Sequence, residues 1–274
     1  MASFRNEDDR LDLSEIVELF FLWYRLPTMS KKTVTLSFVI PAHNEEKLLP
    51  STLRNIQDIR RRLRERSREA EVIVVDDGSS DSTAEIAGNT GAQVVHINRR
   101  QIAAARNAGA AVASGRFLFF VDADTLPSEK TVWKAVRALE SGAVVGGGCH
   151  IVTDDPRAYR VRIPVFVWWW ISRTFRVAAG AFLFCRTDSF RKIGGFKEEY
   201  FVAEEIILSR DLKKVGRTEG RRFIILKETA VTSARKAALY SLPEIFLTLL
   251  PLWFRPRRSM RDRNALPIWY DGRR

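Results

Sequence analysis

From residue 34 onward, short apolar runs typical of strands alternate with longer segments whose apolar residues recur at helical spacing. Strands are predicted at residues 34–40, 71–75, 93–97 and 116–121. Between the first two, apolar side chains at steps of three and four predict one helical stripe: Leu49, Leu53, Ile56, Ile59 and Leu63. This alternation predicts an α/β fold, with an open, mostly parallel sheet and helices on its faces.

Local signals place the ends of several elements. Pro41 is expected to end the first strand, and Pro50 fits the first helix only within its first turn. Ser82 and Glu85 have the spacing of a capping box, which predicts the start of the next helix. Further helices are predicted at residues 101–114 and 203–215, and further strands near 143–152 and 181–186.

The composition is that of an ordinary globular protein. The 274 residues suffice for one large domain or two small ones, and 46% hydrophobic with 28% charged residues argue against disorder. The two cysteines, Cys149 and Cys185, form no C-x-x-C motif, so we interpret them as reduced thiols in the core.

The formal net charge is +12, and most of it lies in two segments. Residues 60–68 carry six arginines against one glutamate, and residues 255–274 carry seven arginines against two aspartates. The first segment ends a predicted helix, where cations complement the carbonyl dipole. We interpret both as surface patches. A nucleic-acid-binding protein is disfavoured because basic and aromatic residues are not interleaved on a recognisable module.

Two apolar stretches raise the question of a membrane. Residues 163–171 (IPVFVWWWI) and 239–254 (LYSLPEIFLTLLPLWF) both fall short of the roughly 20 uninterrupted apolar residues of a spanning helix. Arginines follow both, which suits a segment in the bilayer interface, and core packing is the alternative. The N-terminus is polar and acidic, unlike a secretory signal. We expect a cytoplasmic protein and leave open a peripheral position on the membrane face.

Candidate chemistry begins with Asp122 and Asp124, a D-x-D that directly follows a buried strand. In open α/β sheets, ligands bind at the carboxyl ends of the strands. Two carboxylates there suit Mg²⁺ or Mn²⁺, and the lack of adjacent Cys or His argues against zinc. A cation held by few protein carboxylates takes its remaining ligands from phosphates and water. An aspartate pair that only shapes a turn is the alternative.

Four motifs in order resemble a known family. They are PAHNEE at 41–46, VVDDGSSDST at 74–83, RNAGAAVASG at 106–115 and FLFFVDADT at 117–125. Together they resemble the nucleotide-sugar-binding half of family 2 glycosyltransferases, which have the GT-A fold. The likeness covers about residues 34–215 and is weakest over 152–179. It implies a nucleotide-diphosphate sugar as donor and a divalent cation, Mg²⁺ or Mn²⁺, as cofactor.

The resemblance also implies roles for individual residues. It implies that the donor is contacted by eight of them: Pro41, His43, Glu45, Asp76, Asp77, Arg106, Asp122 and Asp124. The first three match positions that contact the base and ribose, and one of the next two accepts a hydrogen bond from the base. Arg106 matches a position facing the diphosphate or sugar. The D-x-D, Asp122 and Asp124, meets ribose and the metal-bound diphosphate.

The acceptor side is implied by GGFKEEYFVAEEIILSRDLKKVG at 194–216. The family places a Glu-Asp pair here, with the Asp as catalytic base, and this chain has Glu204 and Glu205 instead. Glu205 aligns with the base and Glu204 with its partner. The extra methylene of Glu changes the reach, so swapped roles or lost activity stay open. Two glutamates that only complement a helix dipole are the plainer alternative.

These observations predict four regions: an amphipathic extension at 1–33, the nucleotide-sugar-binding half at 34–128, the acceptor half of the same domain at 129–235, and an apolar, basic tail at 236–274. The hypothesis is a metal-dependent inverting glycosyltransferase acting on a hydroxyl acceptor, either a glycan or a lipid-linked one. The alternatives are a non-catalytic nucleotide-sugar binder at a membrane surface and a sugar-phosphate nucleotidyltransferase. Against the latter, the loop PAHNEE lacks the glycines of a phosphate loop.

Overall fold

The first half of the protein alternates strands and helices as its apolar pattern predicts. The structure is a computed structural model that describes residues 34–155, 170, 172–235, 244 and 259–265. Its first elements are β1 (Val34–Ala42), α2 (Leu49–Glu65), β2 (Glu69–Asp77), α3 (Thr83–Asn89), β3 (Gln93–Ile97), α4 (Ile102–Val112) and β4 (Phe117–Val121). All five residues of the predicted stripe on α2 are buried, and Pro50 lies in the first turn, so both predictions are confirmed.

The second half contains more regular structure than the sequence pattern indicates. Its elements are β5 (Thr125–Pro127), α5 (Glu129–Glu140), β6 (Val144–Thr153), β7 (Phe182–Arg186), α7 (Thr187–Lys192), α8 (Glu204–Thr218), β8 (Arg222–Thr232) and a short 3₁₀ turn, η1 (Arg263–Ala265). The elements β6, β7 and α8 were predicted. The strand β8 and the helix α5 were not, although β8 brings the chain back to the D-x-D.

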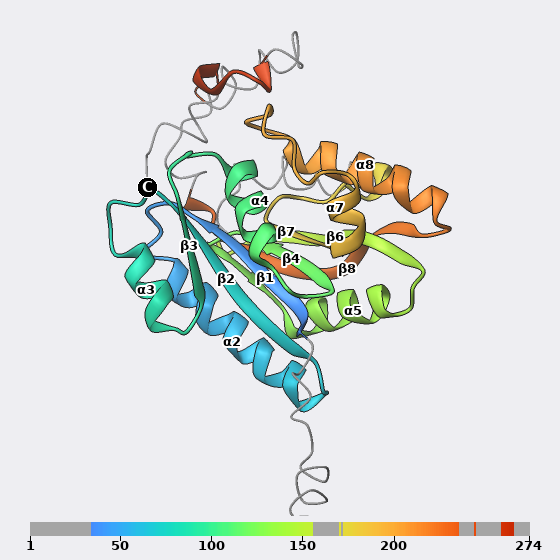
Figure 1. The fold of residues 1–274 in the computed structure, drawn as a ribbon, viewed down its shortest axis with the longest axis horizontal. Coiled ribbons are helices and arrows are strands. Elements are labelled where there is room, and N and C mark those ends of the chain that lie inside the picture. Colours follow the sequence, from blue (N-terminus) through green and yellow to red (C-terminus); the bar gives the residue numbers. More distant parts are fainter. Residues whose placement is uncertain (1–33, 156–169, 171, 236–243, 245–258, 266–274) are drawn as a thin grey trace, which may run out of the picture. The chain divides into compact units, whose positions relative to one another are not determined.

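One eight-stranded sheet joins both halves in the order β3-β2-β1-β4-β7-β6-β8-β5. Four of the seven pairings are parallel, and the antiparallel ones involve β7 or β5. The fold-class prediction, an open and mostly parallel sheet flanked by helices, is therefore confirmed. Because β1, β2 and β4 are parallel neighbours, their carboxyl ends lie at one edge of the sheet (Figure 1).

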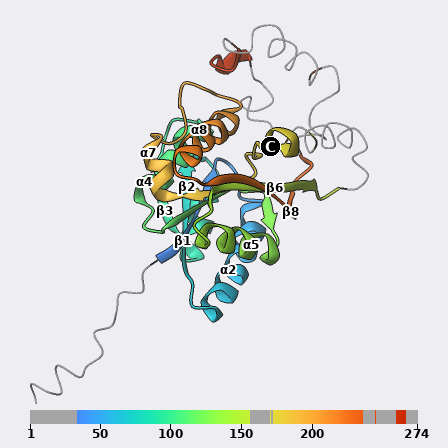
Figure 2. The ribbon, with the colours of Figure 1, turned by 90° about the vertical axis from the view of Figure 1, so that its right-hand side faces the viewer.

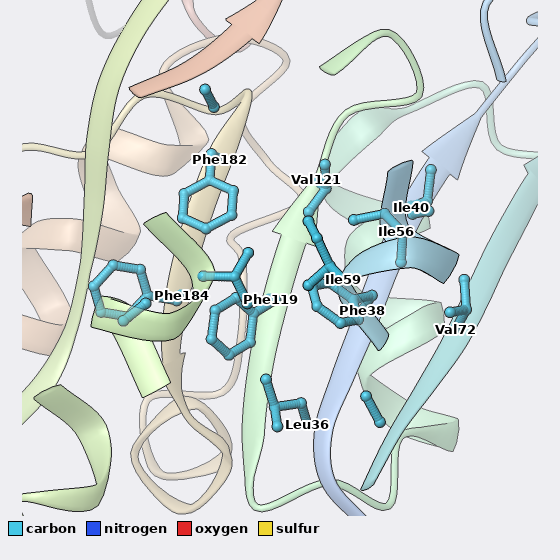
Figure 3. Close-up of a cluster of buried hydrophobic side chains, with 14 of the residues drawn as sticks. Leu36, Phe38, Ile40, Ile56, Ile59, Val72, Phe119, Val121, Phe182 and Phe184 are labelled. Carbon is cyan, nitrogen blue, oxygen red and sulfur yellow. The ribbon is translucent and has the colours of Figure 1, made fainter. Parts of the chain in front are cut away.

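Helices cover both faces of this sheet (Figure 2). The apolar stripes of α2 and α5 pack on one face, and those of α4, α7 and α8 pack on the other. On the first face, the Phe119 ring lies 5.4 Å from Phe38 and 5.9 Å from Phe184, centroid to centroid (Figure 3). These rings come from three adjacent strands, so the packing holds the two halves together in one core.

One local prediction is wrong, and another is confirmed in position but not in its hydrogen bond. The strand β1 does not end at Pro41, which pairs with Val75 of β2, while its pairing with β4 stops at Val39. Proline is tolerated there because β1 no longer pairs with β4 at this position. The N–H that Pro41 lacks therefore removes no hydrogen bond to β4. Ser82 is the N-cap of α3, so the predicted start of this helix is confirmed, but its side chain makes no capping hydrogen bond. Instead the Asp81 carboxylate accepts from the Thr83 amide at 3.0 Å.

The N-terminal extension, most of the Trp-rich segment 163–171 and nearly all of 239–254 lie outside the described residues, so the predictions made for them are not addressed by the structure. Within the part of the chain that is described, no helix combines the length and apolarity needed to cross a bilayer.

Candidate active site

The loops after β1 and β2 form one connected unit at the carboxyl edge of the sheet. The Asn44 amide donates to Ser79 Oγ at 2.9 Å, and the Ser80 amide donates back to Asn44 Oδ1 at 2.8 Å. The Glu45 amide donates to Thr83 Oγ1 at 2.8 Å. These bonds fix the segment that contains Pro41 and His43, both partly buried, against the start of α3.

The adjacent aspartates at the end of β2 have different partners. The Asp77 carboxylate accepts from three successive amides, those of Arg99, Arg100 and Gln101, at 2.6 to 2.7 Å. It therefore shapes the loop that leads into α4. Asp76 accepts from the Ser79 amide at 3.2 Å and lies 3.3 Å from His96 Nδ1. A base contact by either carboxylate stays a prediction, and Asp76 has the less crowded one.

Arg106 of α4 connects the D-x-D with the acidic pair. Its Nη2 donates to Asp122 Oδ1 at 2.9 Å and to the Gly180 carbonyl at 2.9 Å, and its Nη1 donates to Glu204 Oε1 at 2.8 Å. Only 3% of its side chain is exposed, and the guanidinium lies over the Phe196 ring. Its charge is thus directed at two carboxylates of the protein, from positions far apart in the sequence.

Small residues make this placement of Arg106 possible. At Gly109, one turn further along α4, a Cβ would overlap Val39 and lie 2.9 Å from Val75 Cγ2, so glycine lets α4 approach the sheet closely. At Gly180, a Cβ would lie 3.1 Å from Arg106 Nη2, where the guanidinium needs room. Close packing of α4 against the sheet therefore places the Arg106 side chain in the interior, where it pairs with Glu204.

The acidic pair opens α8. Ala203, the N-cap, adopts the left-handed conformation with φ of 63°, and Glu204 and Glu205 are the first two helical residues. Such a backbone costs about 1–3 kcal/mol in a residue other than glycine and persists only where the surroundings hold it. Placing two carboxylates at a helix N-terminus partly offsets their mutual repulsion.

The two glutamates are not equivalent. Glu204 is 5% exposed and paired with Arg106. Glu205 is partly exposed and has no ion pair or side-chain hydrogen bond with any described residue. Burial and the adjacent Glu204 charge raise the pKa of Glu205 to about 8, although Arg106 opposes this shift. Of the two glutamates, Glu205 is therefore the one without an ion pair to Arg106, and its pKa lies near neutral pH.

The D-x-D places two carboxylates, those of Asp122 and Asp124, directly after β4. Asp122 uses Oδ1 for Arg106, and Asp124 Oδ1 accepts from Thr232 Oγ1 at 3.3 Å. Among the described residues, no cluster of three or more His, Cys, Asp or Glu side chains is arranged to hold a metal ion. Two carboxylates with no third ligand fit a Mg²⁺ or Mn²⁺ ion that arrives with a diphosphate, which completes its coordination shell.

A residue that the sequence analysis missed lies beside Asp124. Arg235 follows β8 and donates to both Glu45 oxygens, at 2.9 Å from Nη2 to Oε1 and 3.1 Å from Nη1 to Oε2. No motif marked it, because its place depends on the pairing of β8 with β5, which sets Thr232 opposite Thr125. The implied contact of Glu45 with base or ribose stays a prediction, since here its carboxylate is bound to Arg235.

A mixed α/β sheet with acidic loops at the carboxyl ends of β1, β2 and β4 defines the GT-A class of nucleotide-sugar-binding folds. Solved structures share this fold. S. aureus TarS in complex with UDP-GlcNAc has a TM-score of 0.57 and 21% identity, covering 80% of this chain and 65% of that chain. The Pyrobaculum calidifontis mannosyltransferase PcManGT, in complex with GDP-Man and Mn²⁺, has a TM-score of 0.57 and 21% identity, covering 92% of this chain and 80% of that chain.

The chain belongs to glycosyl transferase family 2, whose family model matches residues 37–195. Among curated relatives, the Streptococcus pneumoniae glycosyltransferase GlyG is 30% identical over 133 residues, covering 45% of this chain and 42% of the relative. A dolichyl-phosphate beta-glucosyltransferase of Dictyostelium discoideum is 30% identical over 146 residues, covering 46% and 44%. The chain spans less than half the length of these two relatives.

Proposed function

We propose that this protein is a metal-dependent, inverting glycosyltransferase that moves a sugar from a nucleotide-diphosphate sugar to an acceptor hydroxyl. The observation that carries the proposal is the Arg106 bridge, which holds Asp122 of the D-x-D and Glu204 of the acidic pair on one guanidinium. A donor-side group and an acceptor-side group are thereby kept in one site, as a displacement at the sugar carbon requires.

Glu205 is the proposed base. Its carboxylate would take the proton from the acceptor hydroxyl as that oxygen attacks the sugar C1 from the face opposite the leaving nucleotide. Arg106 and Glu204 position it, because the ion pair anchors the first turn of α8, and no other side chain in the described part of the chain pairs with Glu205. A raised pKa makes the carboxylate a stronger base once it is ionised.

Asp122 and Asp124 would hold the cation. When bound, Mg²⁺ or Mn²⁺ neutralises charge that develops on the leaving diphosphate. Asp124 is kept in place by Thr232 and by the Ser233 amide, which donates to its backbone carbonyl at 3.2 Å. Structural neighbours in complex with UDP-GlcNAc, or with GDP-Man and Mn²⁺, support a nucleotide-sugar donor and a divalent cation.

The test is a donor screen followed by two matched variants. Purified protein is incubated with UDP- and GDP-sugars and Mn²⁺ or Mg²⁺, and release of free nucleotide diphosphate is measured with and without lipid and glycan acceptors. We expect acceptor-dependent release that stops when the cation is chelated. Glu205→Gln should retain donor binding and lose transfer by about 10²- to 10⁴-fold, and Asp124→Asn should lose the cation-dependent part of binding.

The neighbouring Glu204→Gln variant is the internal control. If it abolishes transfer while Glu205→Gln does not, the two glutamates have exchanged roles. If the protein binds the donor but never transfers the sugar, the non-catalytic binder is the correct function. Formation of a nucleotide sugar from a sugar phosphate and a nucleoside triphosphate would instead identify a nucleotidyltransferase.

We propose further that the acceptor is presented at a membrane surface, where the protein would bind peripherally. Trp170 and Phe175 are 56% and 59% exposed and lie in one short segment with the exposed Arg173 and Arg176. Exposed aromatic rings among cations suit the headgroup region of an anionic bilayer. Binding to phosphatidylserine vesicles that exceeds binding to phosphatidylcholine vesicles, and that falls in the Trp170→Ala/Phe175→Ala double variant, would support this.

A further inference from the structure

Arg235 lies in a short segment that is fastened to the D-x-D loop from the far end of the sequence. The Ser233 amide donates to the Asp124 carbonyl at 3.2 Å, and the Ala234 amide donates to Asp154 Oδ1 at 2.8 Å. Both bonds follow from the pairing of β8 with β5 and β6. The backbone just before Arg235 therefore has a fixed position beside Asp124.

The Arg235 side chain is held with little freedom. Its two terminal nitrogens bind both oxygens of Glu45, and only 18% of the arginine side chain and 7% of the glutamate side chain are exposed. Its Nε is buried and has no hydrogen-bond partner among the described residues. Two-point pairing orients the plane of the guanidinium, which a single bond to a flexible side chain would not do.

Arg235 is attracted by a second carboxylate besides Glu45, that of Asp124. Burial opposes its positive charge, but the hydrogen bonds to Glu45 and the attraction of Glu45 and Asp124 outweigh burial and raise the pKa of Arg235. One guanidinium thus neutralises part of Asp124 as well as Glu45. An anion that enters beside Asp124 would meet a guanidinium whose plane is already fixed by Glu45, and the planar N–H donors of arginine suit phosphate oxygens.

We propose that Arg235 binds the diphosphate of the donor, and that Glu45 is a positioning residue that orients it. This inference rests on the proposed function, since it needs a diphosphate at the D-x-D. It assigns Glu45 a role different from the base or ribose contact that the family resemblance implies. It also gives the leaving group a cationic partner that belongs to the protein itself, in addition to the divalent ion.

The test measures equilibrium binding of inorganic pyrophosphate, UDP and GDP by calorimetry, with and without Mn²⁺. Arg235→Gln should weaken pyrophosphate binding in the absence of metal by about tenfold or more, as expected for losing a charge-assisted contact. Arg235→Lys should retain part of the affinity, because it keeps the charge and loses the two-point geometry. Arg61→Gln, an equal charge change on the exposed surface of α2, should have no effect.

Glu45→Gln separates the two roles of Glu45. If Glu45 orients Arg235, this variant weakens pyrophosphate and UDP alike, and it has no further effect in the Arg235→Gln background. If Glu45 contacts base or ribose, it weakens UDP and leaves pyrophosphate unchanged, which overturns the positioning role.

The remaining outcomes are equally decisive. If the wild-type protein binds UDP or GDP and Arg235→Gln binds all three probes as tightly, the inference is wrong while the proposed function stands. If the wild-type protein binds none of the probes, both fail. Should Arg235→Gln not fold, as judged by circular dichroism, Arg235→Lys decides: weaker pyrophosphate binding supports the proposal and unchanged binding overturns it.

Discussion

At the scale of single residues, the carboxylates of the site outnumber the described cations that pair with them. Arg106 contacts both Asp122 and Glu204, and among the described residues no cation pairs with the adjacent Glu205. Burial, together with the adjacent Glu204 charge, raises the pKa of Glu205 above that of an isolated glutamate. Because one cation pairs with two carboxylates, we expect the loss of any one charge to perturb the site.

The pH dependence of transfer should reveal the raised pKa of Glu205. A base must be ionised to accept a proton, and the pKa of Glu205 is raised to about 8. We expect kcat/KM to rise by up to tenfold per pH unit below pH 8 and to level off above it. In Glu204→Gln this rise should move to lower pH, because the repelling charge is gone. A flat profile between pH 6 and 9 would exclude Glu205 as the base.

Removal of the Arg106 charge should be costly for folding. Arg106→Met keeps the apolar part of the side chain and leaves Glu204 buried without a partner, so we expect a loss of about 3–5 kcal/mol in the free energy of unfolding. The loss should be smaller at pH 5 than at pH 7, because the unpaired carboxylates then take up protons. Urea titrations at both pH values measure this, with Arg106→Lys as the charge-retaining control.

At the scale of elements, the helix α4 determines where Arg106 lies. Its small residues let it pack closely against β1 and β2, and Gly109 is the point of closest approach, next to Val39 and Val75. The helix α8 determines where the acidic pair lies, since it begins at Glu204, directly after the left-handed Ala203. Arg106 and Glu204 thus come from two helices, α4 and α8, that pack on the same face of the sheet.

Substitution of Gly109 tests this close approach. In Gly109→Ala the added methyl would overlap Val39, so α4 must shift, and we expect a cost of about 1–3 kcal/mol and reduced transfer through displacement of Arg106. The matched control is Gly88→Ala in α3, where nothing lies within 4 Å of the new Cβ. That variant should gain about 0.5–1 kcal/mol. Thermal or urea unfolding of both decides, and equal effects would contradict the packing argument.

At the scale of the whole molecule, one sheet carries both the loops proposed to bind the donor and the proposed acceptor side. Every residue of β4 pairs with β7, which connects onward to β6 and β8. Neither half can therefore lose its strands without exposing the core of the other, and we expect the strands and helices from β1 to β8 to unfold as one unit.

The two cysteines provide a probe of that cooperativity. Cys149 of β6 is 2% exposed and Cys185 of β7 is 0% exposed, and burial raises the pKa of both thiols. We expect neither to react with a thiol reagent in the native protein, and both to become reactive at the urea concentration where circular dichroism reports unfolding. Reaction of one thiol at a lower concentration would show that the halves separate.

The sequence by itself determined the features that local patterns encode. The buried stripe of α2, the strands β1 to β4 and the D-x-D after β4 follow from apolar periodicity and short motifs, because such signals lie within a few residues. The strand β8 was missed because partly exposed positions blur its alternation. The tertiary structure alone decided which charges meet. Arg106 reaches Glu204 across 98 residues and Arg235 reaches Glu45 across 190, because strand order, which is set by packing of the whole sheet, brings them together.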